Sequence, residues 1–296
     1  MRNDCSPRQL AEAIGVSESS VKRWIDEGTI AASRTAGGHR RVRLSEAVRF
    51  VRASGMPIVR PEVLGLVDLK LAAGSRSGAE AAFEQALVEG RADVVRGIVL
   101  SRFLDGEPPA TICDGPVASA MHAIGELWRN DPAGIAVEHR ATELCLQALG
   151  LVRSLVPAAT AGAPAAVGCA PAGDPYLLPT FMSAFVLEAD GWRATNFGPD
   201  FPLERLAEAA EAECASLAWV SVTSESAGAD LVREIRELAE RLARSGIRLI
   251  AGGRALPRSL EVPGAPYSLG RTMRDLVASA REVQESATAA AIRLPA

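Results

Sequence analysis

Aromatic residues are scarce in this chain of 296 residues, at 4% of the sequence, and there are only three histidines. The five cysteines form no CxxC pair, which argues against a disulfide framework or a zinc site. No apolar run is long enough to span a bilayer, and the amino terminus lacks the apolar core of a signal peptide. P-loop, GxGxxG, GxSxG and HExxH patterns are also missing. These absences favour a cytoplasmic protein without enzymatic activity or a membrane partner.

Positive charge is concentrated at the amino terminus. Residues 1–60 carry 11 Lys/Arg against 6 Asp/Glu, and the other 236 residues carry 21 against 30. A head of net charge +5 on a body of net charge −9 suits a small module that meets phosphate, attached to a part that does not. The length predicts two or three domains.

The run from Pro7 to Arg43 has the pattern of a helix-turn-helix followed by a basic hairpin. Ser6 is suited to cap a first helix that begins at Pro7, and Ser17 to cap a second helix that ends near Asp26. A short polar helix can enter the major groove of DNA while a basic hairpin reaches the adjoining phosphates. We expect DNA contacts from Ser19, Ser20, Lys22, Arg23, His39, Arg40, Arg41 and Arg43.

The rest of the chain changes pattern once. Residues 61–157 are helical throughout, with breaks that predict a four-helix bundle. In residues 164–290, helical segments alternate with short apolar strands near 165–170, 192–197, 217–222 and 248–251, which predicts a doubly wound parallel α/β domain. With the DNA-binding head over residues 1–58, this gives a multidomain α and α/β protein.

The segment RTAGGHRRV and the helices before it resemble the winged helix-turn-helix of MerR-family transcription regulators. The resemblance implies a regulator that binds double-stranded DNA at two-fold related half-sites. It therefore also implies a homo-oligomer, either a dimer or a tetramer.

The stretch IGELWRNDPAGIAVEHRATEL is similar to the helical cap of cobalamin-binding modules. Its Trp-x9-Glu-His spacing resembles that of light-responsive MerR-type repressors that bind adenosylcobalamin, in which the Trp packs over the adenosyl group. The Glu and His of those proteins line the same pocket. The matching residues here are Trp128, Glu138 and His139, with Ile135 and Val137 as nearby wall residues.

Three positions depart from the pattern of these families. Arg129 stands where the light-responsive repressors have a His that captures cobalt after illumination, and a guanidinium has no lone pair to donate. Cobalamin-binding domains also carry Asp-x-His-x-x-Gly after the first strand, and that His ligates cobalt. Here Asp174 is kept, Tyr176 replaces the His and Pro179 replaces the Gly. A phenol with a pKa of about 10 is a poor cobalt ligand, and Pro179 biases Leu178 away from helix.

Two further motifs of cobalamin-binding domains are retained. A Ser-x-Leu/Thr run on a later strand and a Gly-Gly after the next one accommodate the nucleotide tail in that family. The matching residues are Ser221, Thr223, Gly252 and Gly253. Among the other reactive side chains, we expect His122 in the bundle core, Cys214 buried and Cys5 exposed.

The resemblance implies a transcription regulator in which a helical cap and a cobalamin-binding-like sensor domain control oligomerisation or the spacing of the DNA heads. Cobalt ligation by the protein is expected to be lost, with no metal ligands and no catalytic residues. The sequence leaves open whether the effector is adenosylcobalamin, bound without a lower His ligand, or another small molecule. The alternatives are an adenosylcobalamin-dependent light-sensing repressor, a corrinoid carrier subunit and a partner-binding antirepressor.

Overall fold

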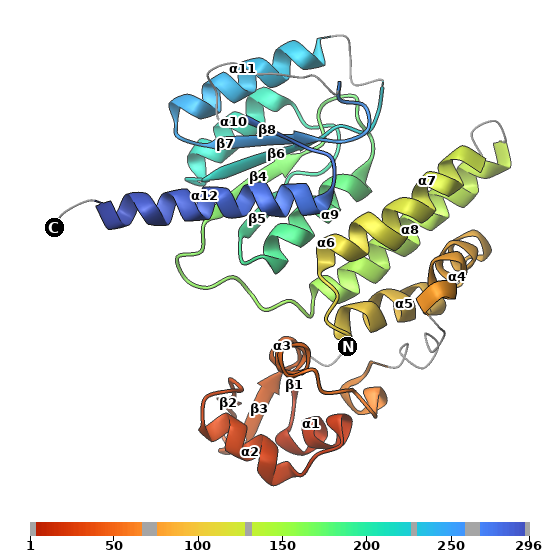
Figure 1. Cartoon of the computed structure of the whole chain (residues 1–296), viewed down its shortest axis with the longest axis vertical. Coiled ribbons are helices and arrows are strands. Elements are labelled where there is room, and N and C mark those ends of the chain that lie inside the picture. The colour runs from red at the N-terminus through yellow and green to blue at the C-terminus, as the bar shows by residue number, and fades with distance from the viewer. Residues whose placement is uncertain (1–3, 67–75, 128–131, 226–229, 258–266, 294–296) are drawn as a thin grey trace. The chain divides into compact units, whose positions relative to one another are not determined.

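The computed structural model of the chain describes residues 4–66, 76–127, 132–225, 230–257 and 267–293. The chain divides into two compact units, Met1–Pro157 and Ala158–Ala296. The first unit holds a small head and a set of packed helices, and the second holds an α/β sheet (Figure 1). Within the described ranges, no helix combines the length and apolar character needed to cross a membrane.

The head contains the predicted helix-turn-helix and hairpin. Helices α1 (Pro7–Ile14) and α2 (Glu18–Asp26) precede an antiparallel pair of strands, β2 (Ser33–Arg34) and β3 (Arg40–Arg43), and α3 (Leu44–Ser54) follows. A strand that the sequence pattern did not predict, β1 (Asp4–Cys5), pairs with β3 and gives the order β1-β3-β2. Two residues are too short a strand to show an alternating pattern.

Local signals account for where the helices of the head begin. The Ser6 hydroxyl accepts a hydrogen bond from the Gln9 amide at 3.2 Å, and the Gln9 side chain accepts one from the Ser6 amide at 2.9 Å. This is a complete capping box, with Pro7 at the first helical position. The Ser17 hydroxyl accepts from the Ser20 amide at 3.1 Å and caps α2. Both predicted caps are confirmed.

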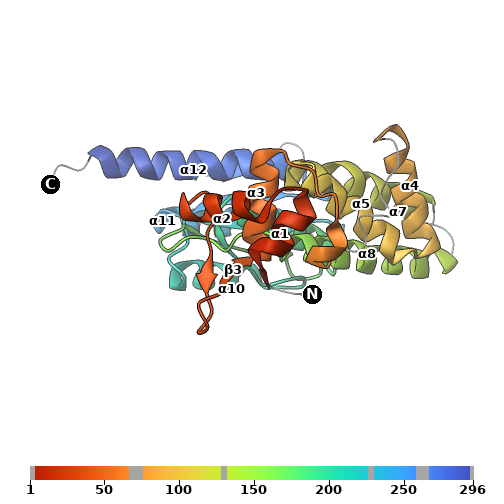
Figure 2. The same ribbon diagram turned by 90° about the horizontal axis from the view of Figure 1, so that it is seen from below.

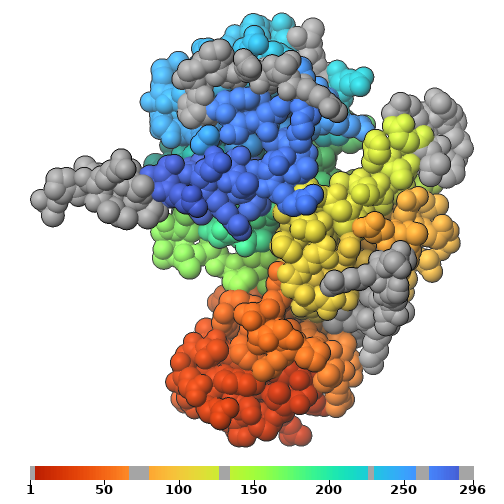
Figure 3. Space-filling view, viewed as in Figure 1, coloured from red at the N-terminus to blue at the C-terminus, as the bar shows by residue number. Residues whose placement is uncertain are grey.

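The head continues past residue 58, where the sequence pattern placed its end. The amides of Val59 and Arg60 donate to the Ala13 carbonyl at 2.8 and 3.0 Å, and the short 3-10 helix η1 (Pro61–Leu64) packs on α1. Leu64 and Leu66 are buried. Residues up to 66 therefore belong to the folded head, which forms a rounded lobe in the space-filling view (Figure 3).

Four helices of the first unit pack against one another beyond the head: α4 (Arg76–Glu89), α5 (Ala92–Leu104), α7 (Ala118–Leu127) and α8 (Pro132–Arg153). Their contact surface includes the buried side chains of Phe83, Leu100, Ile124 and Leu149. Between α5 and α7 the chain forms α6 (Pro109–Ile112) and a π-helical turn, η3 (Cys113–Val117). We call this set the helical bundle.

The second unit is built on a parallel five-stranded sheet in the order β5-β4-β6-β7-β8. The strands are β4 (Ala165–Cys169), β5 (Arg193–Asn196), β6 (Leu217–Ser221), β7 (Arg248–Gly252) and β8 (Tyr267–Gly270). The first four match the predicted strands, and β8 was not predicted. Strand β4 lies inside the sheet. The strand that follows it, β5, pairs with one side of β4, and the next strand, β6, pairs with the other side. Beyond the carboxyl ends of β4 and β6 lies the topological switch point, where such sheets bind ligands.

Helices cover both faces of this sheet (Figure 1). One layer contains α9 (Leu177–Ala189) and α12 (Met273–Arg293), and the other contains α10 (Leu203–Ala212) and α11 (Leu231–Arg244). On the α9 side, the indole of Trp219 lies over Gly168, where any Cβ atom would overlap the ring. Its Nε1 donates to the Thr180 hydroxyl at 3.2 Å and thereby ties α9 to the sheet.

Candidate functional site

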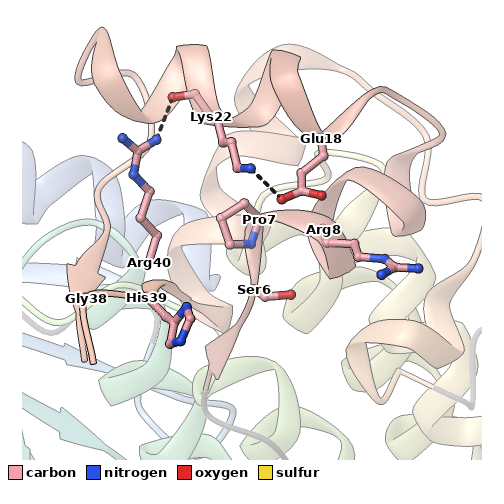
Figure 4. A pocket seen from close by; sticks show the side chains of 8 residues that line it. All are labelled: Ser6, Pro7, Arg8, Glu18, Lys22, Gly38, His39 and Arg40. Carbon is pink, nitrogen blue, oxygen red and sulfur yellow. Dashed lines mark hydrogen bonds and ion pairs between the residues drawn. The ribbon is translucent and has the colours of Figure 1, made fainter. Parts of the chain in front are cut away.

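The start of α1, helix α2 and the hairpin tip enclose a pocket of about 330 Å³ on the head (Figure 4). The loop between β2 and β3 projects beyond the rest of the head (Figure 2). Basic side chains make up half of the pocket lining, which consists of Ser6, Pro7, Arg8, Glu18, Lys22, Gly38, His39 and Arg40. The helix and the hairpin that were predicted to meet DNA are therefore neighbours in the fold.

The amino-terminal turn of α2 presents hydroxyl groups. The Ser17 hydroxyl lies 2.8 Å from that of Ser19 and 2.9 Å from that of Ser20. One turn further along, Lys22 is exposed and pairs with Glu18 at 2.8 Å, and Arg23 is exposed and lies 3.9 Å from Glu27. Exposed ion pairs of this kind are weak, so both cations can exchange their partners for DNA phosphates.

Arg40 was predicted as a DNA contact, and its guanidinium is bonded to other residues of the head. Its Nη2 donates to Asp26 Oδ1 at 2.6 Å, and its Nη1 donates to Asp26 Oδ2 and to the Lys22 carbonyl, each at 3.3 Å. The Arg40 side chain is 23% exposed. Its guanidinium is thus held by α2. Arg41 on the next position lies 3.9 Å from Asp4.

Four exposed basic side chains of the head make no ion pair or side-chain hydrogen bond with the residues that the structure describes: Arg8, Arg34, His39 and Arg43. His39 and Arg43 were predicted as DNA contacts. Arg8 and Arg34 were not, although Arg34 lies opposite Arg40 in the hairpin ladder. Arg34 could therefore have been predicted as an exposed cation of the hairpin from the sequence pattern. Arg8 could not, because only the fold brings it to the pocket.

In the second unit, Asp174 lies at the switch point and is fully buried. Its Oδ1 accepts from the Tyr176 amide at 3.1 Å, and its Oδ2 accepts from the amides of Thr223 and Ser224 at 2.5 and 3.0 Å. The carboxylate thereby bridges the loop after β4 and the loop after β6. Its hydrogen bonds go to the backbone of this chain.

Tyr176 is half-buried at the first position before α9. The Arg254 guanidinium lies 5.6 Å from the centre of its ring, and Arg254 Nε donates to the Thr223 carbonyl at 3.1 Å. The expectation that Pro179 keeps Leu178 out of a helix was wrong, because α9 begins at Leu177. Pro179 falls in the first turn, where backbone amides have no partner within the helix, so its missing N–H has no cost there.

The retained Ser and Gly-Gly motifs line up along the ends of β6 and β7. Ser221 is buried, with its hydroxyl 3.3 Å from that of Ser183 on α9. A Cβ atom on Gly252 would overlap the Gly270 carbonyl, and one on Gly253, with φ of 117°, would overlap the Val222 carbonyl. Close approach of the protein's own backbone accounts for both glycines.

The remaining predicted cofactor residues belong to α8 or precede it. Trp128 lies outside the described residues. Val137 is half-buried and Ile135 is 64% exposed. Glu138 and His139 lie 3.8 Å apart, with side chains 29% and 76% exposed. Across the described ranges, no three His, Cys, Asp or Glu side chains gather in a way that could hold a metal ion.

Three expectations about reactive side chains were wrong. His122 is exposed on α7, and Cys214 is exposed just after α10. Cys5 is buried in β1, and this burial raises the pKa of its thiol to about 11. The terminal strand was not predicted, so Cys5 was placed at a free end of the chain.

The chain matches two known domain families. Residues 5–54 match a helix-turn-helix domain, and residues 79–153 match a B12 binding domain. The second match falls on the helical bundle. The chain has no match among the curated proteins with which it was compared.

One solved structure of a corrinoid protein is similar to this chain in fold. A monomethylamine corrinoid protein from Methanosarcina barkeri aligns with a TM-score of 0.51 at 14% identity, over 71% of this chain and 100% of that chain. A cobalamin-binding protein from Desulfitobacterium hafniense aligns with a TM-score of 0.37 at 17% identity, over 69% and 98% of the two chains. At 14% identity, the first alignment concerns the fold alone.

Proposed function

We propose that this protein is a DNA-binding transcription regulator of the MerR type, with a winged head, and that it has no enzymatic activity. The observation that carries the proposal is the head itself, in which α2 and the hairpin stand side by side. Together they present exposed Lys22, Arg23, Arg34, His39 and Arg43 on a domain that matches the helix-turn-helix family. The net charge of +5 over residues 1–60 supports binding to phosphate.

The proposal is tested by the salt dependence of DNA binding. Wild-type protein is expected to bind duplex DNA of random sequence at low salt, because phosphate contacts do not depend on base sequence. Arg34→Ala and Arg43→Ala are each expected to weaken binding and to reduce the slope of log K against log salt by about 0.9, if each removes one phosphate contact. Arg233→Ala, which removes an exposed Arg of α11, is the control. Wild-type protein that binds no duplex at low salt would refute the proposal.

We propose further that the helical bundle and the α/β unit form a sensor that controls oligomerisation or head spacing in a homo-oligomer. The match to the B12 binding domain supports a corrinoid or a related small molecule as the effector. The protein itself supplies no lower cobalt ligand in this proposal, because a phenol stands at Tyr176 and the Asp174 carboxylate is engaged by three backbone amides. Size-exclusion chromatography with light scattering measures the oligomer with and without ligand.

A second candidate is a light-sensing repressor that depends on adenosylcobalamin, and the match over residues 79–153 favours it. Protein mixed with adenosylcobalamin in the dark and then desalted would retain the visible spectrum of the corrinoid, and illumination would change both the spectrum and the oligomeric state. Protein that stays colourless after desalting would exclude this candidate and leave the proposed DNA-binding function intact. A corrinoid carrier would leave the cations of the head unexplained.

A further inference from the structure

The hairpin of the head is too small to hold its own position. Its ladder consists of two residue pairs, Ser33 with Arg41 and Arg34 with Arg40. The loop adds three further bonds between Thr35 and Gly38 or His39. Strand β1 pairs with Val42 and Arg43 of β3, beyond the two pairs of this ladder. A two-stranded ladder of this length is by itself marginally stable in water. The opposed Arg34 and Arg40 place like charges directly across the ladder, which weakens it further. Something outside the hairpin must fix it against α2.

The period of the strand determines which side chain can do this. Alternate residues of a strand face opposite sides, so Arg40 shares a face with Val42, which is completely buried in the head. Arg40 therefore points toward α2, and the next residue, Arg41, points away. The carboxylate that it meets belongs to Asp26, the last residue of α2. The two side chains form a forked pair with contacts of 2.6 and 3.3 Å, and Arg40 also reaches the Lys22 carbonyl.

We propose that Asp26 and Arg40 are positioning residues, which hold the hairpin at a fixed distance from α2 so that the exposed cations of both elements can reach one DNA backbone. Arg40 is then not itself a phosphate contact. This inference rests on the proposed DNA-binding function. In it, the negatively charged Asp26 holds in place a surface that binds a polyanion. Removing that negative charge must therefore weaken DNA binding, although simple electrostatics predicts the opposite.

The test compares two neighbouring acids of α2 in the full-length protein. Asp26→Asn removes the charge that pairs with Arg40, and Glu27→Gln removes the same charge from a residue that lies 3.9 Å from Arg23 and has no hydrogen bond or ion pair to the described hairpin residues. We expect Asp26→Asn to weaken duplex binding by about tenfold. Glu27→Gln is expected to leave binding unchanged or to strengthen it. The double variant with Arg40→Ala and Asp26→Asn is expected to bind duplex DNA no more weakly than either single variant. Both substitutions act on the same interaction, so their effects should not add.

A measurement without DNA separates the two levels of the proposal. Amide hydrogen exchange of residues 33–43 is expected to accelerate in Asp26→Asn and Arg40→Ala and to stay at the wild-type rate in Glu27→Gln. Tighter binding by Asp26→Asn, or unchanged exchange in its hairpin, would overturn the positioning role while wild-type binding still upheld the proposed function. If wild-type protein bound no duplex, the proposed function would fail, and accelerated exchange would show that the pair still fixes the hairpin.

Discussion

Asp174 matches the Asp of the sequence motif of cobalamin-binding domains, and the structure shows what this side chain contacts here. In that motif a His follows two residues after the Asp, and this chain has Tyr176 at that position. In the structure the carboxylate is fully buried and accepts three backbone hydrogen bonds. A buried polar group needs such hydrogen-bond partners, so the two loops and the Asp174 side chain depend on one another.

At the residue scale we predict that Asp174→Ala destabilises the α/β unit by about 2–4 kcal/mol, because it leaves buried backbone amides without an acceptor. Asp174→Asn keeps the shape but offers one acceptor oxygen, so its loss of stability is expected to be intermediate. Urea denaturation followed by circular dichroism measures both. Wild-type stability in Asp174→Ala would mean that water replaces the carboxylate at the switch point.

Glu46 joins separate elements of the head. It lies on α3, accepts from the Ala31 amide at 2.8 Å and pairs with Arg49 at 2.6 Å, so it anchors the segment between α2 and β2. The hydrogen bonds from Arg49, with a smaller contribution from the Ala31 amide, hold the pKa of Glu46 below its ordinary value of 4.5. The ionised form is thereby favoured in the folded state.

At the element scale we predict a pH-dependent effect of Glu46→Gln. A carboxyl whose pKa is lowered by folding contributes stability above its unfolded pKa, and this contribution is lost as the pH falls through the folded value. The variant is expected to be about 1–2 kcal/mol less stable than wild type at pH 7. That difference should shrink below about pH 4.5. Amide exchange of residues 27–34 over a pH series measures it, and a difference that did not shrink as the pH fell below 4.5 would contradict the prediction.

Arg52 connects the two parts of the first unit. It lies on α3, and its guanidinium donates to the carbonyls of Phe103 and Glu107 at the end of α5 and stacks 3.8 Å from the centre of the Phe103 ring. Partial burial lowers the pKa of Arg52. A cation is favoured at the carboxyl end of a helix, so this contact gives the head a defined attachment to the bundle.

At the scale of the whole molecule we predict that Arg52→Ala loosens the head from the bundle without unfolding either. Exchange of amides near residues 103–107 should accelerate, and limited proteolysis between head and bundle should become faster. Arg52→Lys keeps the charge but not the planar fork, so it is expected to restore little. Arg49→Ala, on the same helix, is the control. Unchanged proteolysis in Arg52→Ala would show that the attachment lies elsewhere.

Much of the fold followed from patterns within short stretches of sequence. The caps at Ser6 and Ser17 and four strands of the sheet were predicted, because each depends on residues that are close in the chain. Strands β1 and β8 were missed, since β1 has two residues and the residues of β8 are mostly half-buried. The helix and the hairpin that were predicted to meet DNA lie together in the fold, but the partner of each cation in them was not predicted.

By itself, the sequence determined a basic helix-turn-helix head, a helical segment and a parallel α/β domain, because composition and periodicity act locally. Only the tertiary structure decided which polar groups are engaged inside the protein. Arg40 meets Asp26 across 14 residues, and Asp174 meets the Thr223 amide across 49. A charge that faces solvent and one that faces a partner look alike in the sequence, because their surroundings are supplied by distant parts of the chain.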